Sequence, residues 1–139
     1  MDAIAAGMLA VIVLLLAFSA FFSGAETALT AASRPLMHQR EISGDIRAAL
    51  VNGLRRDKER LLGSILIGNN LVNILASVLA TYALTDIFGS AGLAYATIAM
   101  TVMVVVFAEV LPKTYAITHA DRMALAVAPA VRFVVVLLT

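Results

Sequence analysis

The sequence predicts an all-α membrane protein with three transmembrane helices plus juxtamembrane amphipathic helices, its N-terminus outside the cell and its C-terminus inside. Of its 139 residues, 62% are hydrophobic and only 14% are charged, against about 25% charged residues in a typical soluble domain. Three segments, 3–22, 61–85 and 87–108, contain no Asp, Glu, Lys or Arg. Each is long enough to cross a bilayer as a helix, which takes roughly 20 residues.

The first apolar segment is expected to remain in the protein as a membrane span. No basic residue precedes it, and it continues into Ser23-Gly24-Ala25-Glu26 without the small-residue cleavage pattern of a signal peptide. We expect this helix to continue to about Ala32. Arg34-Pro35 then ends or restarts it, because proline cannot donate a hydrogen bond inside a helix.

The basic residues predict the orientation of the chain in the cell membrane. Seven of the ten Lys and Arg residues lie between Arg34 and Arg60, while Lys113 and Arg122 follow the third span. Cytoplasmic flanks of membrane spans are enriched in Lys and Arg. The region 34–60 and the region after 112 are therefore expected in the cytoplasm, in a multi-pass protein of the plasma membrane.

The basic region 34–60 also contains an apolar pattern of helical period. Ile46, Leu50 and Leu54 recur every four residues, which suits an amphipathic helix on the inner leaflet. An ordinary helix in a cytoplasmic loop explains the pattern equally well. Asp57 is the expected N-cap of the second span.

The segment 86–92 is short and contains two glycines, so the second and third spans should form an antiparallel hairpin. Residues 123–139 include Pro129 and Arg132, which would make a poor span. We therefore expect a juxtamembrane or interfacial helix there, with a fourth span as the alternative. The chain stops inside an apolar run, and we expect residues 1–139 to be the transmembrane ion-transport domain of a longer protein.

Polar residues lie inside all three predicted spans, where they are costly and are candidates for function. The first span carries Ser19, Ser23 and Glu26 on one helical face. The second and third spans add further polar residues and a nearby proline, namely Asn69, Asn70, Asn73, Glu109 and Pro112.

These hydroxyl, amide and carboxylate oxygens are hard ligands that suit Mg²⁺, Ca²⁺ or Na⁺ and do not suit zinc or copper. No cysteine is present, and His38 and His119 fall in the cytoplasmic flanks. Pro112 removes the usual helical partner of the Ala108 carbonyl, so an unwound backbone next to Glu109 is expected to supply a further ligand. Helix packing by the serines and interhelical hydrogen bonding by the asparagines remain open for each residue taken singly.

Three motifs resemble the transmembrane module of the CorC/CNNM family of magnesium transporters, and together they cover nearly the whole chain. They are Ser19-Ala-Phe-Phe-Ser-Gly-Ala-Glu-Thr27, Gly68-Asn-Asn-Leu-Val-Asn73 and Glu109-Val-Leu-Pro-Lys-Thr114. The resemblance implies a homodimer in which each subunit binds a largely dehydrated Mg²⁺ in an inward-facing cavity. It further implies Mg²⁺ export, coupled to Na⁺ entry, by a secondary transporter that is not an enzyme.

Carried over to this sequence, the resemblance makes Ser19, Ser23, Asn70 and Glu109 the expected Mg²⁺ ligands. Other polar residues would support these ligands or line the ion pathway, together with the motif proline, namely Glu26, Asn69, Asn73 and Pro112. Family members continue into cytoplasmic CBS domains that bind ATP, and these lie outside this chain. No nucleic-acid partner is expected.

Two other functions remain open at this stage. A membrane-anchored Mg²⁺ sensor that regulates a separate transporter would need the same ligands. A membrane platform that holds cytoplasmic domains together would use the asparagines for subunit packing.

Overall fold

The computed structural model describes residues 3–138, apart from the side chains of Ala5 and Ile87, and this part of the chain is helical with short connections. In chain order, the elements are α1 (Ala3–Ala31), α2 (Arg34–Ile42), α3 (Ile46–Arg56), α4 (Lys58–Phe88), the 3-10 turn η1 (Gly89–Ala91), α5 (Gly92–Met103), the π-helical segment η2 (Val104–Val110), α6 (Leu111–Thr118) and α7 (Ala120–Leu138).

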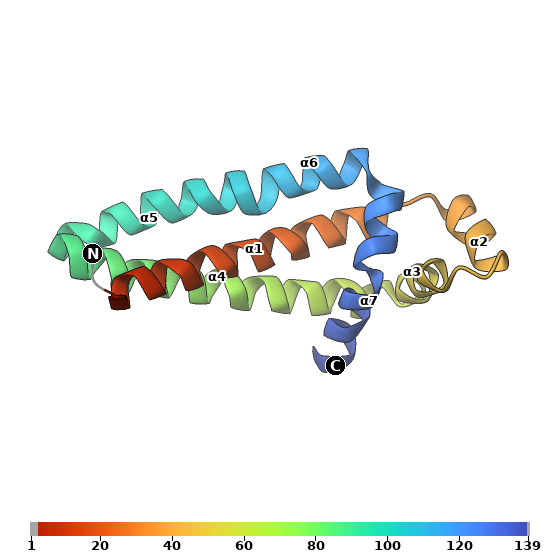
Figure 1. Ribbon diagram of the computed structural model, residues 1–139, viewed down its shortest axis with the longest axis horizontal. Helices are drawn as coiled ribbons and strands as arrows, with labels where there is room; N and C mark the ends of the chain where they lie inside the picture. Colours follow the sequence, from red (N-terminus) through yellow and green to blue (C-terminus); the bar gives the residue numbers. More distant parts are fainter. Residues whose placement is uncertain (1–2, 139) are drawn as a thin grey trace.

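Three long rods lie side by side, formed by α1, by α4 and by the continuous segment α5–η2–α6 (Figure 1). Within the described residues, three stretches are long and apolar enough to cross a membrane, namely Ala6–Ala31, Lys58–Asp86 and Gly89–Thr118. The three predicted spans are therefore confirmed. Helix α7 runs across the rods near the ends that lie away from the connection between α4 and α5 (Figure 1). It is not among the membrane-spanning stretches, as expected for a juxtamembrane helix.

The third rod changes its neighbour along its length. Helix α5 packs against α4, whereas η2 and α6 pack against α1. The buried residues accordingly form two apolar clusters. One joins α1, α4 and α5 near the connection between α4 and α5, and the other joins α1, α2, α3, α4, α6 and α7 at the opposite end. The change of neighbour takes place around the π-helical segment.

The hairpin between α4 and α5 depends on two glycines. Gly89 has φ +72° and ψ −144°, a conformation that residues with a Cβ atom rarely adopt. Gly92 faces the backbone of the preceding helix, because an added Cβ atom would overlap the carbonyl group of Leu84 and come within 2.5 Å of the Cα atom of Thr85. The close approach of the two helices thus requires glycine at position 92.

Replacing Gly92 with alanine is expected to destabilise the protein by about 3 kcal/mol, since the added methyl group meets backbone that cannot rotate away. Thermal unfolding in detergent, followed by circular dichroism, measures the loss. Gly63→Ala is the matched control, because Gly63 also lies in a helix and nothing lies within 4 Å of its added Cβ atom. An equal midpoint for both variants would contradict this account of the hairpin.

Short polar caps define the α2–α3 hairpin at the basic end of the molecule. The side chain of Ser33 accepts the backbone N–H of Leu36, and that of Asp45 caps α3. Asp57 caps α4 by accepting the backbone N–H of Arg60 at 3.3 Å, as predicted from the sequence. Each cap satisfies a backbone donor that a helix start leaves without a partner.

Helix α3 packs against α7 along one side of its surface. The residues buried on α3 are Ala48, Val51 and Leu54, and only Leu54 belongs to the predicted apolar line. Ile46 is 77% exposed. Ile46 therefore lies outside the contact with α7 and is available to a lipid surface, so an amphipathic helix on the inner leaflet stays a prediction.

Two hydrogen bonds tie the end of α1 to α3 and α7. The carboxylate of Asp121 accepts the backbone N–H of Ser33 at 2.6 Å, and the Arg55 guanidinium donates to the carbonyl oxygen of Ala32 at 2.9 Å. Burial and the nearby Arg34 lower the pKa of Arg55, while Asp121 opposes this shift. This junction fixes α7 against the ends of the rods that lie next to the α2–α3 hairpin.

Candidate ion site between the transmembrane helices

The two serines of α1 form a polar layer inside the membrane-spanning part of the molecule. Ser19 is 0% exposed and Ser23 is 3% exposed. Ser19 lies between the two apolar clusters, since Leu16 belongs to one cluster and Phe22 to the other, and Ser23 follows at the edge of the second cluster. A hydroxyl group at this depth has no bulk water to bond with, so its partner must be protein or a ligand.

Ser19 bonds across to the second rod. Its hydroxyl oxygen donates a hydrogen bond to the amide oxygen of Asn69 on α4, and the two oxygens are 2.7 Å apart. The motif residues of the first two spans are therefore in direct contact. Such interhelical bonds within a membrane are worth about 0.6–1.7 kcal/mol, which suffices to orient the Asn69 amide.

The three asparagines of α4 face different surroundings. Asn69 is half-buried against α1, and Asn70 is exposed on the surface of this chain. Asn73 is half-buried, and its amide oxygen is buried without a hydrogen-bond partner. A buried carbonyl-type oxygen without a donor is costly. It is therefore a candidate ligand for a cation or for water, and it stands one helical turn from Asn69.

Glu109 lies in the π-helical segment of the third rod and is half-buried. The sequence led us to expect an unwound backbone before Pro112, and this expectation was wrong. The chain stays helical through residues 104–118, and the backbone N–H of Leu111 bonds to the carbonyl oxygen of Val106. A wider turn makes room for the proline ring, which would clash with the carbonyl one α-helical turn before it.

Glu109 is level with the two serines along the bundle. Pro112 is adjacent to Gly24 of α1, because a Cβ atom added to Gly24 would lie 3.6 Å from the Cβ atom and from the carbonyl oxygen of Pro112. Helix α1 and the third rod run in the same direction (Figure 1). Glu109 precedes Pro112 by three residues, so at about 1.5 Å per residue its level falls between Ser19 and Ser23.

Glu26 lies one turn closer to the basic end of the bundle than Ser23. It is half-buried, and its backbone carbonyl accepts a hydrogen bond from the Thr30 hydroxyl at 2.9 Å. Its position on the face of the serines suits a residue on the approach to the polar layer.

The candidate ligand atoms are oxygens, and at the level of the serines they include one carboxylate, that of Glu109. Among the described residues, no group of three or more His, Cys, Asp or Glu side chains could hold a metal ion. A cation in the polar layer would therefore contact one carboxylate and several neutral oxygens. Mg²⁺ commonly binds in this way, through one or two carboxylates, other oxygens and retained waters.

A polar groove of about 420 Å³ runs from Asn73 toward the hairpin, between α4 and the third rod. The threonine hydroxyls in this groove donate to backbone carbonyls one turn earlier, as Thr97 does to Leu93 at 2.9 Å and Thr101 does to Thr97 at 2.6 Å. Their remaining lone pairs make the groove rich in acceptors. This groove was not predicted from the sequence. The pattern that could have revealed it is a polar residue at every fourth position along α4, at Asn73, Ser77 and Thr81.

Residues 10–139 match the family model of the cyclin M (CNNM) transmembrane N-terminal domain. The chain is 45% identical over 106 residues to the UPF0053 inner membrane protein YfjD of Escherichia coli K12, covering 76% of this chain and 25% of that protein. It is 41% identical over 118 residues to the chloroplastic DUF21 domain-containing protein At1g55930 of Arabidopsis thaliana, covering 82% and 17%.

A UPF0053 protein of Haemophilus influenzae is 39% identical over 123 residues, covering 88% of this chain and 29% of that protein. The chain thus spans less than a third of the length of these relatives. The matched residues include the three polar motifs, the second and third spans and most of the first span. The chain is therefore a multi-pass membrane protein that belongs to the CNNM transmembrane domain family.

Proposed function

We propose that this chain is the membrane domain of a magnesium transporter that holds its cargo ion in the polar layer between the rods. The observation that carries the proposal is the hydrogen bond from Ser19 to Asn69, at the level of Glu109 and next to the buried Ser23. Two hydroxyls, an amide and a carboxylate from three different spans would then be available to a cation at one level of the bundle. Packing alone would not require a carboxylate there.

The structure favours Asn69 and Asn73 as the amide ligands. Asn69 already contacts Ser19, and the buried amide oxygen of Asn73 has no partner. The resemblance to the family pointed instead to Asn70, which is exposed on this chain. The proposed ligand set is therefore Ser19, Ser23, Asn69, Asn73 and Glu109, and mutants of the three asparagines distinguish the two assignments.

Transport direction and partners form part of the same proposal. The basic hairpin α2–α3 lies toward the same end of the bundle as α6 (Figure 1), the helix that contains Lys113. This supports a cytoplasmic location for this end and an external N-terminus. The ion would enter from that end past Glu26 and leave along the groove beyond Asn73. The proposal also includes export coupled to Na⁺ entry, a homodimer with one ion path per subunit, and regulation by ATP through cytoplasmic domains.

Calorimetry on the purified chain tests the asparagine assignment. Asn69→Ala and Asn73→Ala are each expected to weaken Mg²⁺ binding roughly tenfold or more, as the loss of one ligand-supporting group does in other metal sites. Asn70→Ala is the matched control on the same helix and should bind Mg²⁺ like the wild type. A selective loss in Asn70→Ala would instead favour the assignment from the family resemblance.

Sealed vesicles distinguish transport from sensing, which is the second candidate function. A transporter should move Mg²⁺ across the membrane, and Na⁺ on the opposite side should accelerate this flux. A sensor should bind Mg²⁺ with the same dependence on Asn69 and produce no flux. Vesicles made with Asn69→Ala protein provide the background rate.

A further inference from the structure

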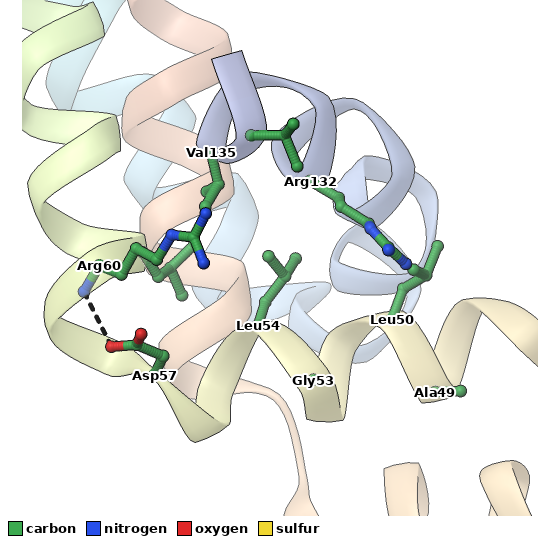
Figure 2. A pocket seen from close by; sticks show the side chains of 10 residues that line it. Ala49, Leu50, Gly53, Leu54, Asp57, Arg60, Arg132 and Val135 are labelled. Atoms are coloured by element: carbon green, nitrogen blue, oxygen red, sulfur yellow. Dashed lines mark hydrogen bonds between the residues drawn. The ribbon is translucent and has the colours of Figure 1, made fainter. Parts of the chain in front are cut away.

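A second polar site lies at the junction of α3, α4 and α7, away from the polar layer. There a hollow of about 320 Å³ opens between the helices (Figure 2). Its walls are largely apolar and include Leu54, Leu61 and Val135. Arg60 of α4 and Arg132 of α7 border the same hollow. Two guanidinium groups from different helices thus face one space with apolar walls.

The positive charge of the hollow exceeds its negative charge. Asp57 is the one carboxylate among its lining residues, and this side chain caps α4 through the backbone N–H of Arg60. In the part of the chain that the structure describes, Arg132 has no carboxylate within ion-pair distance. In Figure 2 the guanidinium of Arg60 extends toward Val135, and the side chain of Arg132 extends toward Leu50. A compact anion would complement this arrangement.

The C-terminal turns of α7 also border an apolar groove. Ala130, Phe133 and Val134 line a space of about 600 Å³ together with α1 residues between Leu14 and Phe22. Those α1 residues belong to the first membrane span, so this groove lies at the depth of lipid acyl chains. Arg132 therefore borders the cationic hollow, while Phe133, the next residue, borders the apolar groove at the depth of the lipid acyl chains.

The position of the hollow in the membrane follows from its helices. Arg60 lies two residues after the start of the Lys58–Asp86 span, at the end of the bundle where the basic α2–α3 hairpin lies (Figure 1). Long basic side chains at the end of a span commonly reach the headgroup layer. The hollow is thus at headgroup depth, and the apolar groove is deeper.

We propose that one anionic phospholipid of the inner leaflet binds at α7, with its phosphate between Arg60 and Arg132 and an acyl chain in the groove at Phe133. Guanidinium groups form paired hydrogen bonds with phosphate oxygens, and the apolar walls of the hollow suit the glycerol end of the lipid. The bound lipid would hold α7 against α1 and α4. A soluble phosphate would use only the two arginines and would leave the groove unoccupied, so the lipid accounts for both features.

Native mass spectrometry of the purified chain, loaded with a mixture of phosphatidylglycerol and phosphatidylcholine, tests the proposal. The wild type should retain one phosphatidylglycerol molecule in preference to phosphatidylcholine. Arg132→Gln should reduce this retention roughly tenfold or more, because a charge-assisted hydrogen bond to the phosphate is lost. Arg47→Gln is the matched control, since Arg47 is exposed on α3 and does not border the hollow.

Two further arms identify the bound species. Phe133→Ser should weaken retention of the lipid while leaving the effect of inorganic phosphate on thermal stability unchanged. Displacement of the lipid by inorganic phosphate at equal concentration would overturn the lipid assignment in favour of a soluble anion. Equal retention of both lipids by the wild type, or unchanged retention in Arg132→Gln, would overturn the site itself.

Discussion

Replacing Glu109 with glutamine is expected to abolish saturable Mg²⁺ binding. Glutamine keeps the size of the side chain and one carbonyl oxygen, so the change removes a negative charge and little else. A divalent cation between apolar clusters needs a counter-charge, and removal of one partner of a buried charge pair typically costs about 3–5 kcal/mol. That loss corresponds to roughly a hundredfold or more in affinity.

The measurement is calorimetric titration of purified protein with Mg²⁺, together with thermal unfolding of each variant. Glu59→Gln is the control, because Glu59 is exposed in the first turn of α4 and its charge can be removed without touching the polar layer. Both variants should unfold at the wild-type temperature. Unchanged Mg²⁺ affinity in Glu109→Gln would place the ion elsewhere, whatever the fate of the asparagine variants.

The sequence predicted the three spans and the hairpin because both depend on local chemistry. A long uncharged segment in lipid forms a helix because its backbone N–H and C=O groups must hydrogen-bond within the segment. Charges such as Lys58 and Asp86 mark the ends of a span, and glycines mark the turn. Asp57 as an N-cap was predictable for the same reason, since a capping side chain acts on its own helix start.

The direction in which each motif residue points was harder to predict. Asn69 and Asn70 are neighbours in the sequence, and adjacent residues of an α-helix differ by about 100° around the axis. Which of the two faces α1 depends on the rotation of α4, and this rotation is set by packing. Contacts such as the one between Gly68 and the ring of Phe22, where an added Cβ atom would lie 3.0 Å from the ring, fix it in the structure.

The π-helical segment could not be predicted from Pro112 alone. A proline inside a helix can kink it, unwind it or be accommodated by a wide turn. The outcome depends on what lies beside the proline, here Gly24 of α1. A side chain at position 24 would make only ordinary contact with Pro112, whereas its Cβ atom would lie 2.5 Å from the Cε atom of Met123. The glycine thus makes room for α7, and the continuous helix keeps its packing on both sides of the wide turn.

Replacing Pro112 with alanine is expected to weaken Mg²⁺ binding roughly tenfold or more without lowering the stability of the fold. Alanine restores a backbone N–H and removes the ring, and proline inside a helix is disfavoured by about 3 kcal/mol. The segment 104–110 would then revert to α-helix. Loss of the wide turn would rotate one part of the rod relative to the other by about one residue, or 100°, so the direction of the Glu109 side chain relative to the polar layer would change.

Binding and stability should therefore change independently in this variant, and this result separates a geometric role of Pro112 from simple misfolding. Pro35→Ala is the control, because Pro35 lies in the first turn of α2, where a helix does not need the missing N–H. Wild-type Mg²⁺ affinity in Pro112→Ala would show that packing of α1 maintains the wide turn without the proline. Weakened binding with an unchanged or higher unfolding temperature would show that the proline positions the carboxylate of Glu109.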